Sequence, residues 1–182
     1  TITTIDGKVF VFTVNDNRSP STRRRQIDVA TYDGSSWTTS GDIPGRSIAR
    51  GYWPVARTKN GTMYLFVLNP VSPNSFSIYT YKNGTWSTFI EEYAYPSSEP
   101  GAEPATYHSF SLYCPDMVID DDGNIYLGIC YDYSPQVLKI DANTKEINRI
   151  GSVIPSPGNT SGRTCRIALS PLGRLYMAYR NS

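Results

Sequence analysis

NGTMYLF at residues 60–66 joins a tight Asn-Gly turn directly to a run of apolar and aromatic residues. Asn-Gly is the preferred centre of a two-residue hairpin turn, and the residues after it favour β-strand structure. Variants of this stretch recur along the chain, at residues 6–12, 122–127 and 172–177. Their marker glycines, Gly7, Gly61, Gly123 and Gly173, are separated by 54, 62 and 50 residues. Repeats of this length are typical of four-stranded β-sheet units and not of helical repeats.

Each of the first three marker hairpins is followed by a second predicted hairpin, so that a complete repeat contains four strands. The predicted strands are residues 1–5, 8–14, 26–32 and 36–39 in the first repeat, 52–58, 62–69, 76–82 and 85–90 in the second, 117–120, 124–132, 136–140 and 146–150 in the third, and 166–169 and 174–180 in the last. Connections rich in Pro, Ser and Gly separate the repeats, because proline cannot donate a backbone hydrogen bond inside a sheet. We therefore predict an all-β, propeller-like array of four-stranded antiparallel blades, about three and a half in this chain. The blades span residues 1–45, 46–100, 101–158 and, in part, 159–182 of a single domain, 1–182.

Two hairpins carry a tyrosine before the turn and a tryptophan after it: YDGSSW at residues 32–37 and YKNGTW at residues 81–86. They resemble the Tyr-x-Gly-Trp hairpins of extracellular β-propeller repeats, including sialidase-like and lectin propellers. The resemblance covers most of the chain as a pattern and matches no single family. A sialidase Asp-box would read Ser-x-Asp-x-Gly-x-Thr-Trp, whereas here the Asp or Asn directly precedes the glycine. The resemblance implies a propeller outside the cell that binds or cleaves sugars.

The charge balance excludes several classes of partner. Seventeen basic residues against sixteen acidic ones leave a net charge of +1, so no large overall field attracts nucleic acid or anionic lipid. The basic run at residues 23–25 is interpreted as the solvated entrance of a strand. No apolar stretch reaches the roughly 20 residues that a membrane-spanning helix needs. We therefore expect no nucleic-acid partner and no membrane span.

Four Asn-x-Ser/Thr sequons, at Asn17, Asn60, Asn83 and Asn159, lie in predicted turns or loops, where a glycosylation acceptor is accessible. Asn-Gly is also ordinary hairpin chemistry, and Ser and Thr are abundant in this chain. The first residue, Thr1, indicates a processed or excised chain and is compatible with a removed secretion signal. We predict an extracellular glycoprotein, secreted or at the cell surface, with these four asparagines as acceptors.

The three cysteines, Cys114, Cys130 and Cys165, contain no CxxC pair, so zinc and thioredoxin-type chemistry are poorly supported. If the first hairpin of the third repeat turns through a three-residue loop, Asp120 faces Asn124, and the same register places Cys114 opposite Cys130. We predict a Cys114–Cys130 disulfide, in agreement with a secreted protein. The alternative is three buried reduced thiols, and Cys165 is left over on either interpretation.

The last predicted blade has two strands, whereas a closed propeller uses about four to eight complete blades. Three explanations remain open: the strand count is wrong, the chain is part of a longer protein, or the open edge pairs with another molecule. The terminal segment has high strand propensity and no proline, so its unpaired backbone groups favour edge pairing. The residues of this predicted assembly edge are Leu175, Tyr176, Met177, Ala178 and Tyr179. We predict self-association through terminal strands, into an oligomer or a fibre.

No catalytic constellation is evident, and we predict no catalytic residue, no cofactor and no metal. The acidic run at residues 120–124 could offer oxygen ligands to Ca²⁺, but its residues also suit a hairpin turn, which is the favoured interpretation. His108 is the single histidine, and no nucleophile elbow surrounds any serine. A glycosidase would need two facing carboxylates and, in the sialidase type, several arginines. The candidates are Glu91, Glu92, Asp116 and Asp132, with Arg50, Arg57, Arg166 and Arg180.

A sugar-binding site needs fewer functional groups than a catalytic site, since an aromatic face and a few polar groups suffice. Trp53, next to Tyr52 and close to Arg50 at the mouth of a predicted inner strand, is the favoured ligand-binding group. Trp37 and Trp86 are interpreted as packing residues between blades.

The predicted function is a non-catalytic extracellular structural or adhesive subunit that self-assembles. The alternatives are a carbohydrate-binding, lectin-like propeller with a glycan ligand and, third, a propeller glycosidase or polysaccharide lyase; whether the protein is an enzyme is left open.

Overall fold

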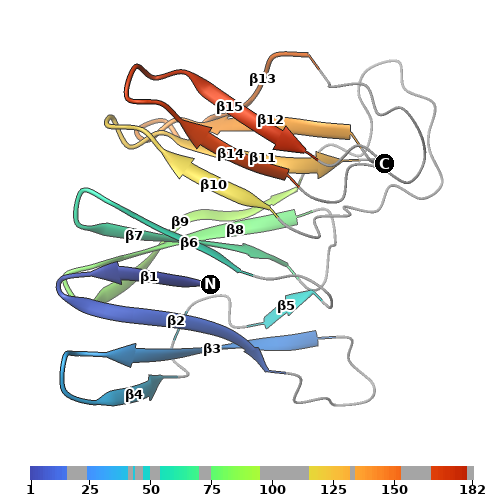
Figure 1. Ribbon diagram of the computed structural model, residues 1–182. Helices are drawn as coiled ribbons and strands as arrows, with labels where there is room; N and C mark the ends of the chain where they lie inside the picture. The colour runs from blue at the N-terminus through green and yellow to red at the C-terminus, as the bar shows by residue number, and fades with distance from the viewer. Residues whose placement is uncertain are drawn as a thin grey trace. The chain divides into compact units, whose positions relative to one another are not determined.

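The computed structural model describes residues 1–15, 24–40, 43, 47–49, 54–69, 75–94, 115–131, 134–152 and 165–179. All regular structure in these ranges is β-strand, arranged in antiparallel sheets (Figure 1), which confirms the predicted all-β class. No helix in the described ranges has the length and hydropathy of a membrane span. The chain divides into two compact units, Thr1–Ala94 and Tyr95–Ser182, and each is described by itself. The extent of the single predicted domain, 1–182, stays a prediction.

The N-terminal unit contains two sheets, each built as predicted from two consecutive hairpins. The first sheet has the order β1-β2-β3-β4, with strands β1 (Ile2–Ile5), β2 (Lys8–Asn15), β3 (Arg24–Tyr32) and β4 (Trp37–Ser40), and the short strand β5 (Ser47–Ala49) also pairs with β3. The second sheet has the order β6-β7-β8-β9, with strands β6 (Val55–Lys59), β7 (Thr62–Leu68), β8 (Ser75–Lys82) and β9 (Thr85–Ala94). This up-and-down order follows from the tight turns, because a short hairpin turn joins neighbouring antiparallel strands.

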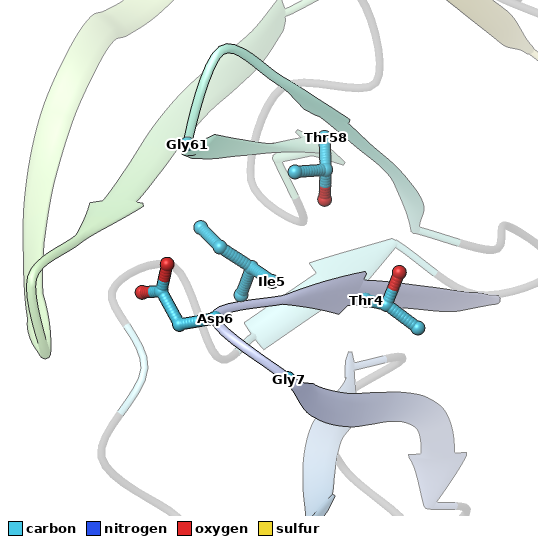
Figure 2. Close-up of a pocket in the computed structure, with 6 residues that line it drawn as sticks. All are labelled: Thr4, Ile5, Asp6, Gly7, Thr58 and Gly61. Carbon is cyan, nitrogen blue, oxygen red and sulfur yellow. The ribbon is translucent and has the colours of Figure 1, made fainter.

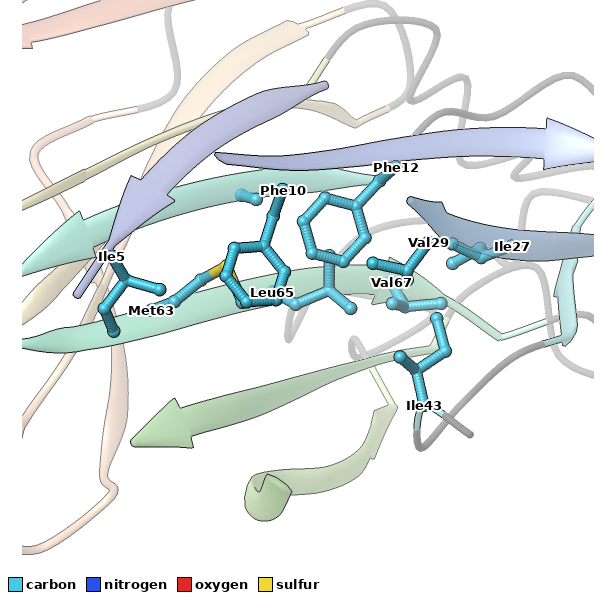
Figure 3. Close-up of a cluster of buried hydrophobic side chains, with 10 residues drawn as sticks. Ile5, Phe10, Phe12, Ile27, Val29, Ile43, Met63, Leu65 and Val67 are labelled. Atoms are coloured by element: carbon cyan, nitrogen blue, oxygen red, sulfur yellow. The ribbon is translucent and has the colours of Figure 1, made fainter. Parts of the chain in front are cut away.

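The core of the N-terminal unit lies between its two sheets (Figure 3). The register of β2 and β3 pairs Phe12 with Val29, and the alternating side chains that share this face of the sheet are buried. They pack with buried residues of the second sheet, Met63, Leu65 and Val67. Strand β7 is also buried on its other face, through Phe66 and Leu68. It is therefore covered on both faces, as its continuous apolar run predicts.

The two predicted packing tryptophans differ. Trp86 is half-buried and packs edge-on against Phe12 of the other sheet, with ring centroids 6.4 Å apart, so the packing interpretation holds for it. Trp37 is 57% exposed and stacks on Tyr32 of its own hairpin, with ring centroids 5.2 Å apart. The prediction that Trp37 packs between blades is wrong within this unit. Tyr32 and the paired Trp37 lie on the face of the sheet away from the core, because alternation along β3 puts Val29 and Tyr32 on opposite sides.

The C-terminal unit contains a four-stranded sheet and a separate hairpin. The sheet has the order β10-β11-β12-β13, with strands β10 (Asp116–Ile119), β11 (Ile125–Tyr131), β12 (Ser134–Ile140) and β13 (Ile147–Ile150). The hairpin pairs β14 (Cys165–Leu169) with β15 (Leu175–Tyr179), and no further strand among the described residues joins it, as the predicted half blade requires. On β15, Tyr176 is 57% exposed and Tyr179 is 39% exposed, whereas Leu175 and Met177 are half-buried. Pairing of this edge with another molecule stays untested.

The acidic run at residues 120–124 forms the turn between β10 and β11, as predicted. Asp120 Oδ1 accepts a hydrogen bond from the backbone N–H of Asn124 at 2.8 Å, and Oδ2 accepts hydrogen bonds from Asn124 Nδ2 at 2.9 Å and from the Tyr126 hydroxyl at 3.1 Å. Asn124 Oδ1 accepts a hydrogen bond from the backbone N–H of Ala142, which connects this turn to the turn between β12 and β13. Within the described part of the chain, no group of three or more His, Cys, Asp or Glu side chains is arranged to hold a metal ion. The Asp120 carboxylate therefore organises a turn.

Asp120→Asn is expected to weaken the C-terminal unit by about 1 kcal/mol at neutral pH. Burial opposes ionisation of Asp120, but hydrogen bonds from Asn124 and Tyr126 outweigh it and hold its pKa below the ordinary value. A lowered pKa stabilises the folded state above the unfolded-state pKa of about 3.9, and this contribution is lost as the pH falls through the folded-state pKa. In urea unfolding, the wild type and Asp120→Asn should therefore differ at neutral pH and converge near about pH 2. Asp122→Asn, an exposed change of the same charge in the same turn, is the control; a pH-independent difference for Asp120→Asn would contradict the assignment.

Candidate functional site

The two ends of each sheet carry different connections. At one end the strands are joined by short turns, at residues 6–7, 33–36, 60–61, 83–84, 120–124, 141–146 and 170–174. The opposite ends lead into the other connections, which are longer except between β11 and β12. They include residues 16–23, 50–53, 70–74, 95–114, 132–133 and 153–164, which lie outside the described residues. Binding and catalytic residues concentrate on such connections. These ends, here called the long-connection ends, are therefore the candidate location of function.

Several residues proposed from the sequence belong to these connections. They are Arg50, Tyr52 and Trp53 before β6, His108 and Cys114 before β10, Asp132 after β11, and the sequon residues Asn17 and Asn159; all of them, and Arg180, lie outside the described residues. The residues before β6, those before β10 and the residue after β11 are close in sequence to the long-connection ends of these strands. In a propeller, the first strand of each blade is the inner strand that faces the central channel. The described residues next to these connections begin β6 in the N-terminal unit and β10 and β14 in the C-terminal unit, and each unit is considered by itself.

Asp116 is the one carboxylate on the described inner strands, at the first position of β10. Its side chain is 5% exposed. Oδ1 accepts a hydrogen bond from the backbone N–H of Met117 at 3.0 Å, and Oδ2 accepts one from the backbone N–H of Ile167 at 3.2 Å. Such donors are needed because an unpaired buried charge is strongly unfavourable. The second hydrogen bond crosses from the sheet to β14, so Asp116 holds two inner strands together.

Cys130 of β11 and Cys165 of β14 are buried thiols that are not in a disulfide. Their side chains are hydrogen-bonded to each other, and this bond, together with burial and the nearby Asp116 charge, raises the pKa of Cys165. Strands β10 and β11 have the predicted register, with Asp116 opposite Gly128, but Cys114 lies outside the described residues. The Cys114–Cys130 disulfide therefore stays a prediction. Among the described residues, the thiol next to that of Cys130 belongs to Cys165, for which the sequence analysis proposed no disulfide partner.

Two of the candidate arginines lie on described inner strands. Arg57 of β6 is half-buried and donates from Nη1 to the carbonyl oxygen of Ala56 at 2.9 Å. Burial and, after it, the Arg57 charge lower the pKa of the Thr1 amino group. Arg166 of β14 is exposed and donates from Nη1 to the carbonyl oxygen of Cys165 at 3.1 Å. Both guanidinium groups are therefore anchored to the backbone of their own inner strand.

Glu91 and Glu92 lie on β9, at the outer edge of their sheet, and both are exposed. Three strand spacings of about 4.8 Å each place β9 about 14 Å from the inner strand β6. Carboxyl groups that act together on a glycosidic bond lie about 5–9.5 Å apart. Glu92 has a left-handed φ of 42° at an irregularity of the β8–β9 register, where its backbone N–H donates to Ser77 Oγ at 3.2 Å. Neither glutamate can therefore pair with a carboxylate on the inner strand of its own blade.

A pocket of about 380 Å³ lies at the short-turn end of the N-terminal unit, between the β1–β2 and β6–β7 turns (Figure 2). It is lined by Thr4, Ile5, Asp6, Gly7, Thr58 and Gly61. Asp6 is its single carboxylate and belongs to a tight turn, with a φ of 52°. Hydrolytic chemistry needs a pair of carboxylates or a nucleophile next to a base. The residues that line this pocket supply neither, so it is not assigned a reaction.

Asn60 and Asn83, the described sequon residues, are exposed at hairpin turns. Their φ angles are 49° and 51°, and the glycines that follow, Gly61 and Gly84, have φ angles of 67° and 81°. Positive φ at both central residues is the turn geometry for which Asn-Gly is preferred. The hairpin interpretation is confirmed for both asparagines. Their glycosylation, and the extracellular location inferred from it, stay predictions.

Comparisons with known proteins bear on the fold. No protein-family model matches the chain, and no curated protein matches it. Among solved structures, the chain is similar to the α-L-arabinofuranosidase CtGH43 from Clostridium thermocellum ATCC 27405, a β-propeller enzyme, with a TM-score of 0.56 and 16% sequence identity. The similarity covers 100% of this chain and 62% of that enzyme, so the chain spans less than two thirds of the enzyme's length. The propeller-like fold predicted from the repeats is thereby confirmed.

This comparison contradicts the predicted function. The solved structure described above is a glycoside hydrolase, one of several that match, whereas the sequence had favoured a non-catalytic structural or adhesive subunit that assembles through its open blade. That prediction depended on the unfinished last blade. The number of strands in a blade says nothing about chemistry at the inner strands, which is why the inference was wrong. The resemblance to sialidase-like and lectin propellers is confirmed as a propeller pattern alone.

Proposed function

We propose that this protein is a glycosidase that cleaves glycosidic bonds at the long-connection ends of its blades. The observation that carries the proposal is the match of the whole chain to a propeller α-L-arabinofuranosidase. Chemical support comes from the inner strands of the C-terminal unit, which carry the buried carboxylate of Asp116 and the guanidinium group of Arg166. Pentofuranosides are the first substrate class to test, because that enzyme is named for one.

Hydrolysis of a glycoside needs one carboxyl group that protonates the leaving oxygen and a second that activates water or attacks the sugar. Asp116 already accepts two backbone N–H groups, so the proposal gives it a positioning role, in which it holds β14 and Arg166 against the neighbouring sheet. Asp132 follows the last residue of β11, next to a long-connection end. The proposal makes Asp132 one of the two reacting carboxyl groups, with the second supplied by the same set of connections.

Hydrolysis of a panel of nitrophenyl glycosides by the protein in its native length, with the α-L-arabinofuranoside first, tests this proposal. Asp132→Asn is expected to lower kcat/KM by about 10²–10⁴-fold with no change in melting temperature. Asp116→Asn is expected to lower both kcat/KM and the melting temperature, because the β14 backbone loses a charged hydrogen-bond acceptor. Glu91→Gln, on the outer strand β9, is the matched carboxylate control and should change neither kcat/KM nor the melting temperature.

Two results would overturn the proposal. One is the absence of hydrolysis across the panel together with no oligosaccharide binding by calorimetry. The other is full activity of Asp132→Asn, which would remove the residue to which the chemistry is assigned. Equal losses for Glu91→Gln and Asp132→Asn would also contradict it, because the proposal gives no reacting role to Glu91 on the outer strand β9.

A further inference from the structure

The β14–β15 hairpin contacts the four-stranded sheet of its unit through a few residues, here called the sheet–hairpin junction. They are Asp116, Gly128 and Cys130 of the sheet, and Cys165 and Ile167 of the hairpin. A two-stranded hairpin is marginally stable in water by itself. The position of β14 and β15 against the sheet therefore depends on the contacts that this junction supplies.

The junction brings two strands close together. A Cβ added at Gly128 would lie 2.7 Å from Cγ2 of Ile167 and 3.2 Å from Sγ of Cys165, so glycine is what lets β14 approach β11. Gly128 and Cys130 are two positions apart on β11, and Cys165 and Ile167 are two positions apart on β14, so each pair lies on one face of its strand. The two thiols consequently meet across the junction. They are hydrogen-bonded to each other and are 2% and 1% exposed.

We propose that Cys130 and Cys165 form a disulfide that fastens the hairpin to the sheet under oxidising conditions. The hydrogen bond from the Ile167 N–H to Asp116 already ties β14 to β10, the neighbour of β11, so the sulfur atoms are presented to each other by contacts that do not depend on them. A disulfide needs Cα atoms about 4.4–6.8 Å apart, and the close approach of β14 to β11 at Gly128 favours such a separation. The bond closes a loop from Cys130 to Cys165, and such a loop restricts the unfolded chain.

The oxidant in this reaction is a small-molecule disulfide such as oxidised glutathione. One cysteine, as the thiolate, attacks a sulfur of the oxidant and releases one small thiol, and the second cysteine then displaces the other small thiol from the mixed disulfide. Two protein S–H bonds are replaced by one S–S bond, and two electrons and two protons pass to the oxidant. In the folded protein the hydrogen bond between the thiols lowers the pKa of Cys130 and raises that of Cys165, and either cysteine can make the first attack once the hairpin opens. Because both thiols are buried, the reaction belongs to folding or to local opening of the hairpin.

Cys114→Ser provides the test protein, because it leaves Cys130 and Cys165 as the only cysteines of the chain. The protein is refolded in a glutathione redox buffer, its remaining thiols are alkylated, and its peptides from trypsin and an Asp-specific protease are analysed by mass spectrometry without reduction. The expected product joins the peptide that contains Cys130 to the tryptic peptide of residues 164–166. The oxidised protein is expected to melt about 5–10 °C above the same protein after reduction.

The wild-type chain separates the two possible partners of Cys130, because aspartates between Cys114 and Cys130 allow cleavage between them. A link between Cys130 and Cys165 supports the proposal. A link between Cys114 and Cys130 would overturn it, and so would folded Cys114→Ser protein whose two thiols are still alkylated after oxidation. The double variant Cys114→Ser, Cys165→Ser is the control and should melt at the same temperature in oxidising and reducing buffer.

Discussion

Phe12→Ala is expected to lower the free energy of unfolding of the N-terminal unit by about 3–5 kcal/mol. The Phe12 side chain is 2% exposed and belongs to the cluster between the two sheets of that unit. It lies opposite Val29 in the register of its own sheet and meets Trp86 of the other sheet edge-on. Truncation removes the ring and leaves a cavity between strands whose hydrogen-bonded ladders prevent collapse. Urea unfolding followed by circular dichroism measures the loss.

Thr13→Ala is the matched control for this change. Thr13 is the next residue of β2, is exposed, and points to the opposite face of the sheet. Its truncation should change the free energy of unfolding by less than about 0.5 kcal/mol. A loss for Phe12→Ala that is no larger than the loss for Thr13→Ala would show that the two sheets of this unit do not share a core.

The hairpins of this protein could be predicted from the sequence because local chemistry decides them. Asn60-Gly61 and Asn83-Gly84 have the positive φ angles that Asn-Gly favours, and the predicted pairing of Asp120 with Asn124 is present as a backbone hydrogen bond of 3.1 Å. Strand β5 could not be predicted in this way. Its three residues lie in a segment that reads as a connection, and they form a strand through a non-local pairing with β3.

The candidate site was less predictable, because it depends on contacts between residues that are distant in sequence. Asp116 was named as a glycosidase candidate, but its hydrogen bond to Ile167 joins residues 51 positions apart, and no spacing rule indicates such a contact. A signal for the sheet–hairpin junction did exist in Gly128, since an isolated glycine inside an apolar strand indicates close approach of another backbone. The pairing of Cys130 with Cys165 follows from the same approach. A register argument along one hairpin could only offer Cys130 a partner on the adjacent strand.

Gly128→Ala is expected to destabilise the C-terminal unit by about 1–3 kcal/mol, because it overpacks the sheet–hairpin junction. In an ordinary strand the same change would be stabilising by roughly 0.5–1 kcal/mol, since glycine loses more backbone entropy on folding than alanine. Here the new methyl group would lie 2.7 Å from Cγ2 of Ile167 and 3.2 Å from Sγ of Cys165, so the clash outweighs the entropic gain. Urea unfolding gives the free energy. Hydrogen exchange should locate the loss of protection in β14 and β15.

A second substitution in the same chain tests the cause of this loss. Ile167→Ala removes the Cγ2 atom that the new methyl group would meet, and by itself it should destabilise the unit by about 2–4 kcal/mol through a cavity. In the double variant the methyl group at position 128 fills part of that cavity, so the combined loss should be smaller than the sum of the single losses by about 1–2 kcal/mol. The double variant still has some steric strain, because the methyl group at position 128 still contacts Sγ of Cys165. Additive losses would mean that Gly128 is needed for a reason other than the approach of Ile167, and the close contact of β14 with β11 would then lose its main support.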